Sequence, residues 1–215
     1  MAFAGFPAEA FVFYEGLEAD NSKTYWTAHK DVYDGCVRGP MSDLAAELAP
    51  LVRAEPKVFR PHRDVRFSKD KSPYKTHQGA FFEVASGVGY YVHVDAGGLF
   101  TAAGFYAHSR DQTARFRAAV DAPSTGVELE KIVRTLTRHG FEPGGDRVKT
   151  RPRGCPADHP RLELMRHEAL TAGRRHAAGP ELEGRAAFDL VRTDWRRLRP
   201  LVDWVETNVG PFEAD

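Results

Sequence analysis

The hydrophobic period of this chain of 215 residues changes twice, and this change constrains the fold more than any other feature. Up to residue 55 and again after residue 110, apolar side chains recur at spacings of three and four, as on one face of a helix. Between residues 58 and 106, apolar and polar side chains alternate, which is typical of half-buried strands. The pattern predicts an α+β fold in which N-terminal and C-terminal helices pack on a central, mostly antiparallel sheet.

Three helices are expected in the N-terminal part of the chain, residues 7–55. The first spans Ala8–Ala19 and follows an early proline, and the second follows the N-cap side chains of residues 20–22. Its stripe is formed by Trp26, Lys30, Tyr33 and Val37. The third begins at Pro40, because proline is tolerated in the first turn of a helix. Its core face is formed by Leu44, Leu48 and Leu51.

The centre, residues 57–107, is expected to be rich in strands. Residues 90–94 alternate in polarity, and Gly97 and Gly98 separate them from a second strand at 99–106. Adjacent glycines supply the positive φ angles of a tight hairpin, so these two strands should be antiparallel. Another strand is expected at Asp64–Phe67, followed by a turn.

The C-terminal part, residues 110–210, is expected to be helical with a short strand near 146–153. Thr125 and Glu128 have the spacing of a capping box, and Gly140 stands where a helix should end. Two later helices are expected around residues 188–198 and 201–209. The Ala- and Gly-rich span 171–180 is interpreted as a loop, and residues 1–215 are expected to form one domain.

Composition limits the partners and the compartment. Thirty Lys and Arg balance thirty Asp and Glu, so no net field draws the chain to nucleic acid or to an anionic membrane. The sequence has neither a signal peptide nor an apolar run of membrane-spanning length, so a cytoplasmic, soluble protein without membrane contact is expected. Two cysteines are too few for a disulfide framework, which fits a reducing compartment.

The densest polar feature is the string RPHRDVRFSKDKSPYKTH at residues 60–77, where cations outnumber Asp64 and Asp70. A guanidinium group with nearby ammonium and hydroxyl groups can hold phosphate or carboxylate through charge-assisted hydrogen bonds. The candidate ligand-binding residues are Arg60, Arg63, Arg66, Lys71, Tyr74 and Lys75. The alternative is that the two aspartates neutralise the cations in a structural ion-pair network that fixes a turn.

This string carries a resemblance to a known family, together with a GF pair near the start and two later motifs. The later motifs are HKxxY, formed by His29, Lys30 and Tyr33, and DHP, formed by Asp158, His159 and Pro160. The chain resembles bacterial conserved hypothetical proteins grouped as domain of unknown function 2461. The resemblance implies a single α+β domain without an established activity, cofactor or substrate.

Three titratable side chains are candidates for acid–base chemistry: His29, Asp64 and His159. An imidazole titrates near neutral pH, although a lone histidine such as His29 is more often a packing or capping residue. His93 and Asp95 share a strand face, where they either orient each other or join a metal site. No HExxH or CxxC motif supports a metal, and no glycine-rich phosphate loop supports a nucleotide, so neither a metal nor a cofactor is expected.

The sequence supports three hypotheses about function and does not decide among them. The first is a protein that binds, or binds and acts on, a small phosphorylated or carboxylated ligand through residues 60–75. The second is a nucleic-acid-binding protein, which the zero net charge disfavours. The third is a structural or protein-interaction domain without catalysis. The sequence determines neither the substrate nor the reaction, and it leaves open the oligomeric state and whether the protein is an enzyme.

Overall fold

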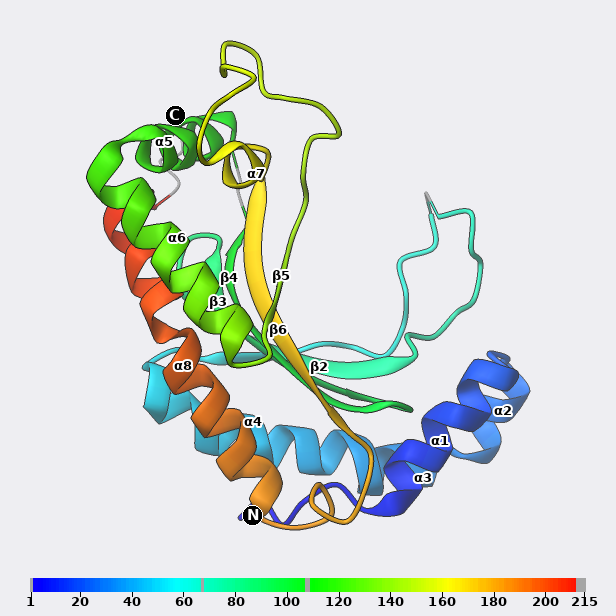
Figure 1. Ribbon diagram of the computed structural model, residues 1–215. Coiled ribbons are helices and arrows are strands. Elements are labelled where there is room, and N and C mark those ends of the chain that lie inside the picture. The colour runs from blue at the N-terminus through cyan, green and yellow to red at the C-terminus, as the bar shows by residue number, and fades with distance from the viewer. Residues whose placement is uncertain (1, 67, 107–108, 212–215) are drawn as a thin grey trace. The chain divides into compact units, whose positions relative to one another are not determined.

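The computed structural model describes residues 2–66, 68–106 and 109–211. Their strands form a six-stranded antiparallel sheet in the order β1-β2-β3-β4-β6-β5. Helices precede and follow the strand-rich centre (Figure 1). The expected α+β class with a mostly antiparallel sheet is confirmed.

The chain folds into two compact units. The first comprises Met1–Phe82, Tyr91–Thr101 and Arg175–Thr193, and the second comprises Glu83–Tyr90, Ala102–Arg174 and Asp194–Asp215. This division does not test the expectation of one domain, which stays a prediction.

The first unit begins with α1, Ala8–Ala19, which has the expected bounds. The expected second helix is instead broken at His29 into α2, Lys23–Ala28, and α3, Lys30–Val32, after which Tyr33–Arg38 form a π-helical segment, η1. Ser22 caps α2, because its hydroxyl accepts a hydrogen bond from the Tyr25 backbone N–H at 3.1 Å. Trp26, Tyr33 and Val37 of the expected stripe are buried, whereas Lys30 is exposed.

Helix α4 spans Gly39–Val52 with Pro40 in its first turn, as expected. Leu44 and Leu48 are fully buried, but Leu51 is 51% exposed, so its predicted place in the core is wrong. Leu51 lies in the last turn of the helix, and the chain leaves that turn through Arg53 in the left-handed conformation.

The sheet begins with β1, Pro56–Val58, which pairs antiparallel with β2, His77–Ala85. The predicted strand at 64–67 is wrong for residues 64–66, which belong to no strand, and Phe67 lies outside the described residues. The Asp64 carboxylate accepts a hydrogen bond from the Arg66 backbone N–H at 3.2 Å. Such a local bond offers the backbone an alternative to strand pairing.

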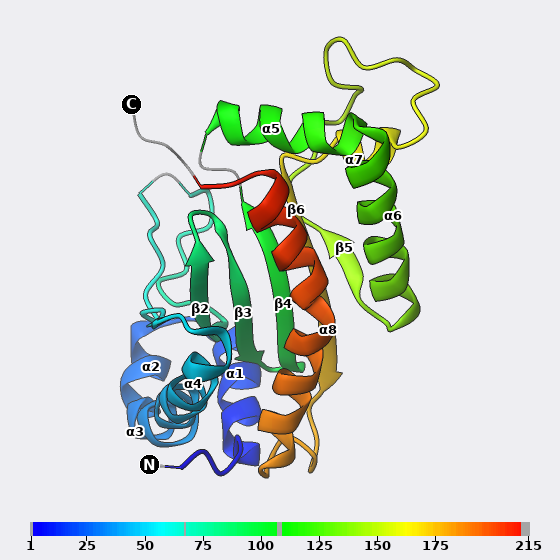
Figure 2. The ribbon, with the colours of Figure 1, turned by 90° about the vertical axis from the view of Figure 1, so that its left-hand side faces the viewer.

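Strands β3, Val88–Asp95, and β4, Gly98–Tyr106, form the expected hairpin and lie side by side next to β2 (Figure 2). Gly98 has a φ of 122°, and a Cβ atom added there would lie 2.2 Å from the His176 carbonyl oxygen. Only glycine fits this position, because both the backbone angle and the close approach exclude a side chain.

The later part of the chain contains α5, Arg110–Asp121, and α6, Pro123–Arg138, followed by β5, Glu142–Gly144. The predicted capping box is wrong: α6 begins before Thr125, whose hydroxyl donates to the Ala119 carbonyl at 2.6 Å. Gly140 follows α6 with a φ of 81°, as expected of a helix end. Strand β5 ends before the expected range 146–153, where only Arg147 forms an isolated bridge, with His167.

A short helix, α7, Leu162–Met165, leads to β6, Ala169–Ala177, and the long helix α8, Ala186–Asn208, follows. Strand β6 contradicts the loop predicted at 171–180, because the small residues there lie within the sheet between β4 and β5. Helix α8 replaces the two predicted helices and contains Pro200. Its buried face continues past that proline through Leu198 and Val202, so packing compensates for the missing backbone hydrogen bond.

Each unit has an aromatic core. In the first unit Phe13 lies 5.9 Å from Trp26 and 5.7 Å from Tyr33 between ring centroids. In the second, Phe116 lies 5.8 Å from Phe105 and 6.1 Å from Trp204. None of the helices within residues 2–66, 68–106 and 109–211 has the length and apolar character that crossing a membrane requires.

Candidate functional site

The basic loop, residues 59–76, connects β1 to β2, and its described residues 59–66 and 68–76 extend away from the sheet (Figure 1). The loop is closed near its base by an antiparallel bridge between His62 and Tyr74. The Arg63 N–H donates to the Pro73 carbonyl at 2.9 Å, and the Lys75 N–H donates to the Pro61 carbonyl at 2.8 Å. These bonds hold the two arms of the loop together where they leave the sheet.

Tyr74 anchors the loop to the N-terminal helices. Its backbone N–H donates to the Asn21 side-chain oxygen at 3.0 Å, and its carbonyl accepts from the Asn21 amide at 3.0 Å. The Tyr74 ring is 6% exposed and stacks on Trp26. The predicted ligand role of Tyr74 stays a prediction, and the position of its ring identifies a packing role.

Two arginines of the loop are paired with carboxylates of the same loop. Arg63 bonds Asp70, and Arg66 donates to Asp64 Oδ2 at 2.6 Å and to Asp64 Oδ1 at 2.9 Å. Bonds from Ser72, followed by those from Arg63, hold the pKa of Asp70 down at about 2. The Arg66 guanidinium and backbone N–H likewise lower the pKa of Asp64. The arrangement has the form of a structural ion-pair network that fixes a turn, which was the alternative prediction for this segment.

Two lysines of the loop donate to backbone carbonyls. The Lys71 ammonium lies 2.9 Å from the Val65 oxygen, and that of Lys75 lies 3.0 Å from the Arg60 oxygen. Lys75 also lies 5.1 Å from the centroid of the Phe59 ring. Anion binding by Arg63, Arg66, Lys71 and Lys75 stays a prediction, and it requires an anion that competes with these internal partners.

The three acid–base candidates have separate surroundings. His29 stacks on Tyr25 with a centroid distance of 4.1 Å, and its Nδ1 lies 2.9 Å from the Tyr25 carbonyl oxygen. Asp64 is paired with Arg66, and His159, in the second unit, places Nε2 3.0 Å from Asp121. No contact among the described residues joins one of these three groups to another, so they do not define a catalytic group together.

A cavity of about 380 Å³ lies beside the base of the basic loop, entirely within the first unit. Its wall includes the rings of Trp26, Tyr33 and Phe59. Its polar lining includes Lys30, Asp34, Arg38, Ser42, Arg60 and His62. Helices α2, α3 and α4 together with η1 supply one side, and the end of β1 with the start of the basic loop supplies the other. The cavity therefore depends on chain segments far apart in the sequence.

The aromatic wall is held in place by a buried hydrogen bond. The Tyr33 hydroxyl donates to the Gln78 side-chain oxygen at 2.6 Å, and burial raises the pKa of Tyr33 to about 12. The Gln78 amide donates in turn to the Phe59 carbonyl at 2.7 Å. Tyr33 therefore remains protonated, and the two rings are connected through one glutamine of β2.

The cavity has an excess of positive charge. Lys30 is paired with Asp34 on the next turn of the helix. Arg38 and Arg60 are exposed, and neither takes part in an ion pair among residues 2–66, 68–106 and 109–211. Arg60 is thus the ligand-binding candidate from the sequence whose guanidinium has neither an ion pair nor a hydrogen bond within the described residues. Arg38 was missed because only the packing of α4 on β1 and on η1, which carries Arg38, brings this side chain beside the loop.

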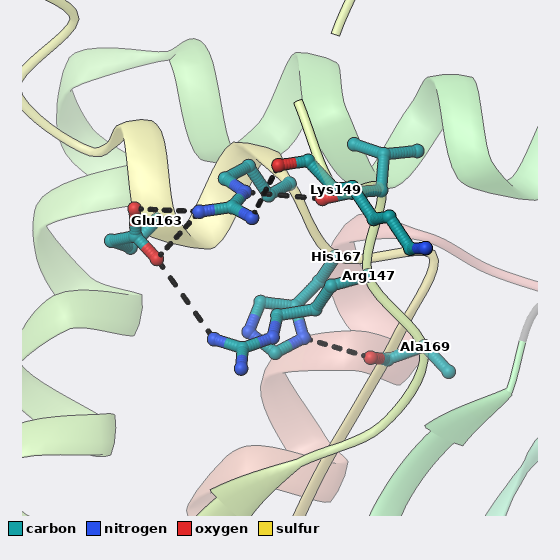
Figure 3. A network of polar contacts seen from close by, with 7 residues as sticks. Arg147, Lys149, Glu163, His167 and Ala169 are labelled. Carbon is teal, nitrogen blue, oxygen red and sulfur yellow. Dashed lines mark hydrogen bonds and ion pairs between the residues drawn. The ribbon is translucent and has the colours of Figure 1, made fainter. Parts of the chain in front are cut away.

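A second polar network lies in the second unit (Figure 3). The Arg166 guanidinium donates to the Val148 and Lys149 carbonyls at 3.1 and 2.8 Å and bonds Glu163 at 3.2 Å. His167 is buried, and its Nδ1 lies 2.9 Å from the Ala169 carbonyl oxygen. The Arg166 bonds tie Val148 and Lys149 to the end of α7, which identifies a structural role.

The fold and this geometry define an α+β protein with an antiparallel sheet and an internally braced basic loop beside a cation-rimmed cavity. Residues 9–204 match the family described as Conserved hypothetical protein (DUF2461), and the chain belongs to that family. No curated protein matches the chain. Within the described residues, no three His, Cys, Asp or Glu side chains gather as a metal site would need.

Proposed function

We propose that the protein binds a small phosphorylated or carboxylated molecule in the cavity beside the basic loop. The observation that carries the proposal is the lining of that cavity, where Lys30, Arg38 and Arg60 face a single carboxylate, Asp34. Two cations therefore remain after Lys30 and Asp34 neutralise each other. Guanidinium groups bind carboxylate and phosphate through paired, charge-assisted hydrogen bonds.

The remainder of the lining suits the uncharged part of such a ligand. Small-molecule sites are concave and mostly apolar, with a few polar groups that fix orientation. Trp26, Tyr33 and Phe59 supply the apolar surface, and the volume of about 380 Å³ is that of a small metabolite site. His62 also lines the cavity, and an imidazole is able to exchange protons with a bound ligand near neutral pH.

The proposal divides the basic segment into two roles. Arg63 and Arg66 brace the loop through Asp70 and Asp64, as the hypothesis of a structural ion-pair network expects. Arg60 contributes to the cavity. Nucleic-acid binding has no comparable support, because the net charge is zero and duplex binding requires many phosphate contacts.

The test is thermal unfolding of the purified protein with a panel of phosphorylated and carboxylated metabolites, together with inorganic phosphate. A ligand at a hundred times its Kd stabilises the folded state by about 2.7 kcal/mol. For a chain of this size that corresponds to a Tm increase of roughly 5–10 °C. Arg60→Gln and Arg38→Gln should each weaken the apparent affinity for the ligand at least about tenfold. The ligand-induced increase in Tm should be smaller accordingly.

Arg66→Gln is the matched control, because it removes a guanidinium from the same loop but outside the cavity. It should leave the ligand-induced increase in Tm intact. A panel without any stabilising ligand, or an equal loss in all three variants, contradicts the proposal. Binding to oligonucleotides that weakens steeply with added salt would favour the nucleic-acid alternative instead.

A further inference from the structure

One face of β3 carries three polar, ionisable side chains in a row: Tyr91, His93 and Asp95. Successive side chains of a strand point to opposite faces, so these three share one face. They are partly exposed, whereas Val92 and Val94 on the opposite face are fully buried. The His93 and Asp95 side chains retain 14% and 17% exposure, so they are not fully covered.

The three side chains form a continuous chain of hydrogen bonds. The Tyr91 hydroxyl lies 3.1 Å from His93 Nδ1, and His93 Nε2 lies 3.1 Å from Asp95 Oδ2. The other oxygen of Asp95 accepts from Arg175 Nη1 at 2.6 Å and from the Gly97 backbone N–H at 2.9 Å. Asp95 is thus held from three sides, and its carboxylate fixes the orientation of the imidazole.

The negative charge of Asp95 determines which atoms donate in these hydrogen bonds. Burial favours the neutral carboxyl, but the hydrogen bonds from His93 and Arg175 outweigh it and hold the pKa of Asp95 below its ordinary value. An ionised carboxylate only accepts hydrogen bonds, so the proton of neutral His93 resides on Nε2. The Nδ1 lone pair then faces Tyr91, whose hydroxyl donates to it.

We propose that Tyr91, His93 and Asp95 form a proton-transfer site that acts on a small anionic substrate carrying an acidic O–H or C–H bond. Tyr91 touches the substrate, His93 is the base, and Asp95 and Arg175 are positioning residues. The order of the groups, a hydroxyl, a histidine and an aspartate, is that of a serine catalytic triad, with tyrosine in place of serine.

The proposed step balances without an oxidant or reductant. The Tyr91 O–H bond breaks as its proton moves to His93 Nδ1, and the tyrosyl oxygen accepts the substrate proton as the substrate O–H or C–H bond breaks. The electron pair of that bond stays on the substrate as an oxyanion or carbanion. The imidazolium formed on His93 is stabilised by the Asp95 carboxylate, as in a catalytic triad.

The surroundings favour an anionic substrate. His77 lies 5.0 Å from His93 between ring centroids, and burial, His93 and Lys75 lower the pKa of His77 to about 4, so it is neutral at physiological pH. Arg175 lies over Phe100, and Phe100 stacks on His93 at 5.0 Å. Tyr14 is buried, and burial followed by the charges of Tyr33, Asp95 and Tyr91 raises its pKa, so it stays neutral. The positive charges of Lys75 and Arg63, which also lower the pKa of His77, and that of Arg175 favour a negative ligand here.

A glycine makes room for the Tyr91 hydroxyl. A Cβ atom added to Gly79 of β2 would lie 2.6 Å from the Tyr91 oxygen, which is closer than side chains pack. The phenol therefore lies across Gly79 with its hydroxyl at His93. None of Tyr91, His93, Asp95 or Arg175 lines the cavity beside the basic loop, so this inference is independent of the proposed function.

The experiment measures the reactivity of Tyr91 toward an arylsulfonyl fluoride, with modified tyrosines quantified by mass spectrometry of the full-length protein. In this reaction the Tyr91 oxygen forms a bond to sulfur, the S–F bond breaks with release of fluoride, and the phenol proton moves to His93. Tyr91 should react at least about tenfold faster than Tyr106, which is 52% exposed. General-base assistance is typically a factor of about 10² or more.

Four variants separate the roles. His93→Gln retains a hydrogen-bonding side chain but cannot take the proton, and it should reduce the Tyr91 rate at least about tenfold. Asp95→Asn should reduce the rate similarly, and Arg175→Gln should reduce it less. His29→Gln is the matched control, because His29 Nδ1 bonds the Tyr25 backbone and the imidazole packs on the Tyr25 ring. The Tyr106 rate should stay constant in all four proteins.

Equal rates at Tyr91 and Tyr106 in the wild-type protein, or an unchanged rate in a folded His93→Gln variant, overturn the proposal. A second measurement needs no variant: long-range ¹H–¹⁵N spectra of the wild-type protein report which imidazole nitrogen carries the proton. Neutral His93 should be protonated on Nε2. Protonation on Nδ1 alone removes the acceptor for Tyr91 and also overturns the proposal.

Discussion

Tyr74 of the basic loop lies almost parallel to Trp26 of α2, with ring centroids 4.2 Å apart and an angle of 7° between the ring planes. Both rings are buried, so this stacked pair ties the loop to the N-terminal helices. Asn21 adds two hydrogen bonds to the Tyr74 backbone. The position of Arg60 beside the cavity therefore depends on an aromatic contact outside the charged residues themselves.

Tyr74→Ala should lower the free energy of unfolding by roughly 3–5 kcal/mol, because truncating a buried aromatic side chain leaves a cavity and removes the stack on Trp26. Urea-induced unfolding measures the change. Tyr74→Phe keeps the ring and should cost less than about 1 kcal/mol. Arg66→Gln in the same loop removes only an exposed ion pair, which contributes little. A comparable loss in Arg66→Gln would show that the ion pairs hold the loop.

Tyr33→Phe should lower the free energy of unfolding by about 1–3 kcal/mol, because it leaves the buried oxygen of Gln78 without its donor. The cavity wall should also loosen, since Gln78 connects Tyr33 to the Phe59 backbone. Tyr106→Phe serves as the control, because Tyr106 is 52% exposed. Equal stability of Tyr33→Phe and the wild-type protein in urea would show that water replaces the lost donor.

The free energy of unfolding should fall as the pH falls from about 6.5 to about 4, because His77 is harder to protonate in the folded state than in the unfolded chain. Burial lowers the pKa of His77 from 6.5 to about 4 in the folded state, so over this window the unfolded chain binds more protons than the folded one. Stability therefore rises with pH between these values and becomes independent of His77 above them. Asp95 and Asp70 have lowered pKa values and lose their contributions only below their ordinary value of 3.8.

The measurement is the urea midpoint of unfolding at a series of pH values, for the wild-type protein and His77→Gln. The variant should show a smaller loss between pH 6.5 and 4, and the two curves should run parallel above pH 7.5. An identical acid slope in both proteins would show that His77 is freely protonated in the folded state.

Gly98→Ala should lower the free energy of unfolding by at least about 2 kcal/mol, because φ is 122° there and the new Cβ atom would meet the His176 carbonyl at 2.2 Å. Gly35→Ala is the matched control. Gly35 lies in η1, and a Cβ atom added there meets nothing within 4 Å, so alanine should be neutral or stabilise by up to about 1 kcal/mol. Similar changes at the two positions would contradict the strain assigned to Gly98.

Local patterns predicted the elements whose boundaries depend on neighbouring residues. Helix α1 has the expected bounds, and the β3–β4 hairpin was predicted from two adjacent glycines. Predictions were wrong where packing overrides local preference. The Ala- and Gly-rich β6 forms a strand because its neighbours in the sheet approach closely, and α8 continues through Pro200 because its apolar face is buried throughout.

The sequence by itself determined that Tyr91, His93 and Asp95 share one face, because a strand has a period of two. It also placed carboxylates among the cations of the basic loop, close enough along the chain to pair with them. Only the tertiary structure brought Arg175 to Asp95, 80 residues away in the chain, and Arg38 to the cavity that Arg60 lines. Contacts between distant segments depend on how the sheet and helices pack as a whole, and no local spacing records that packing.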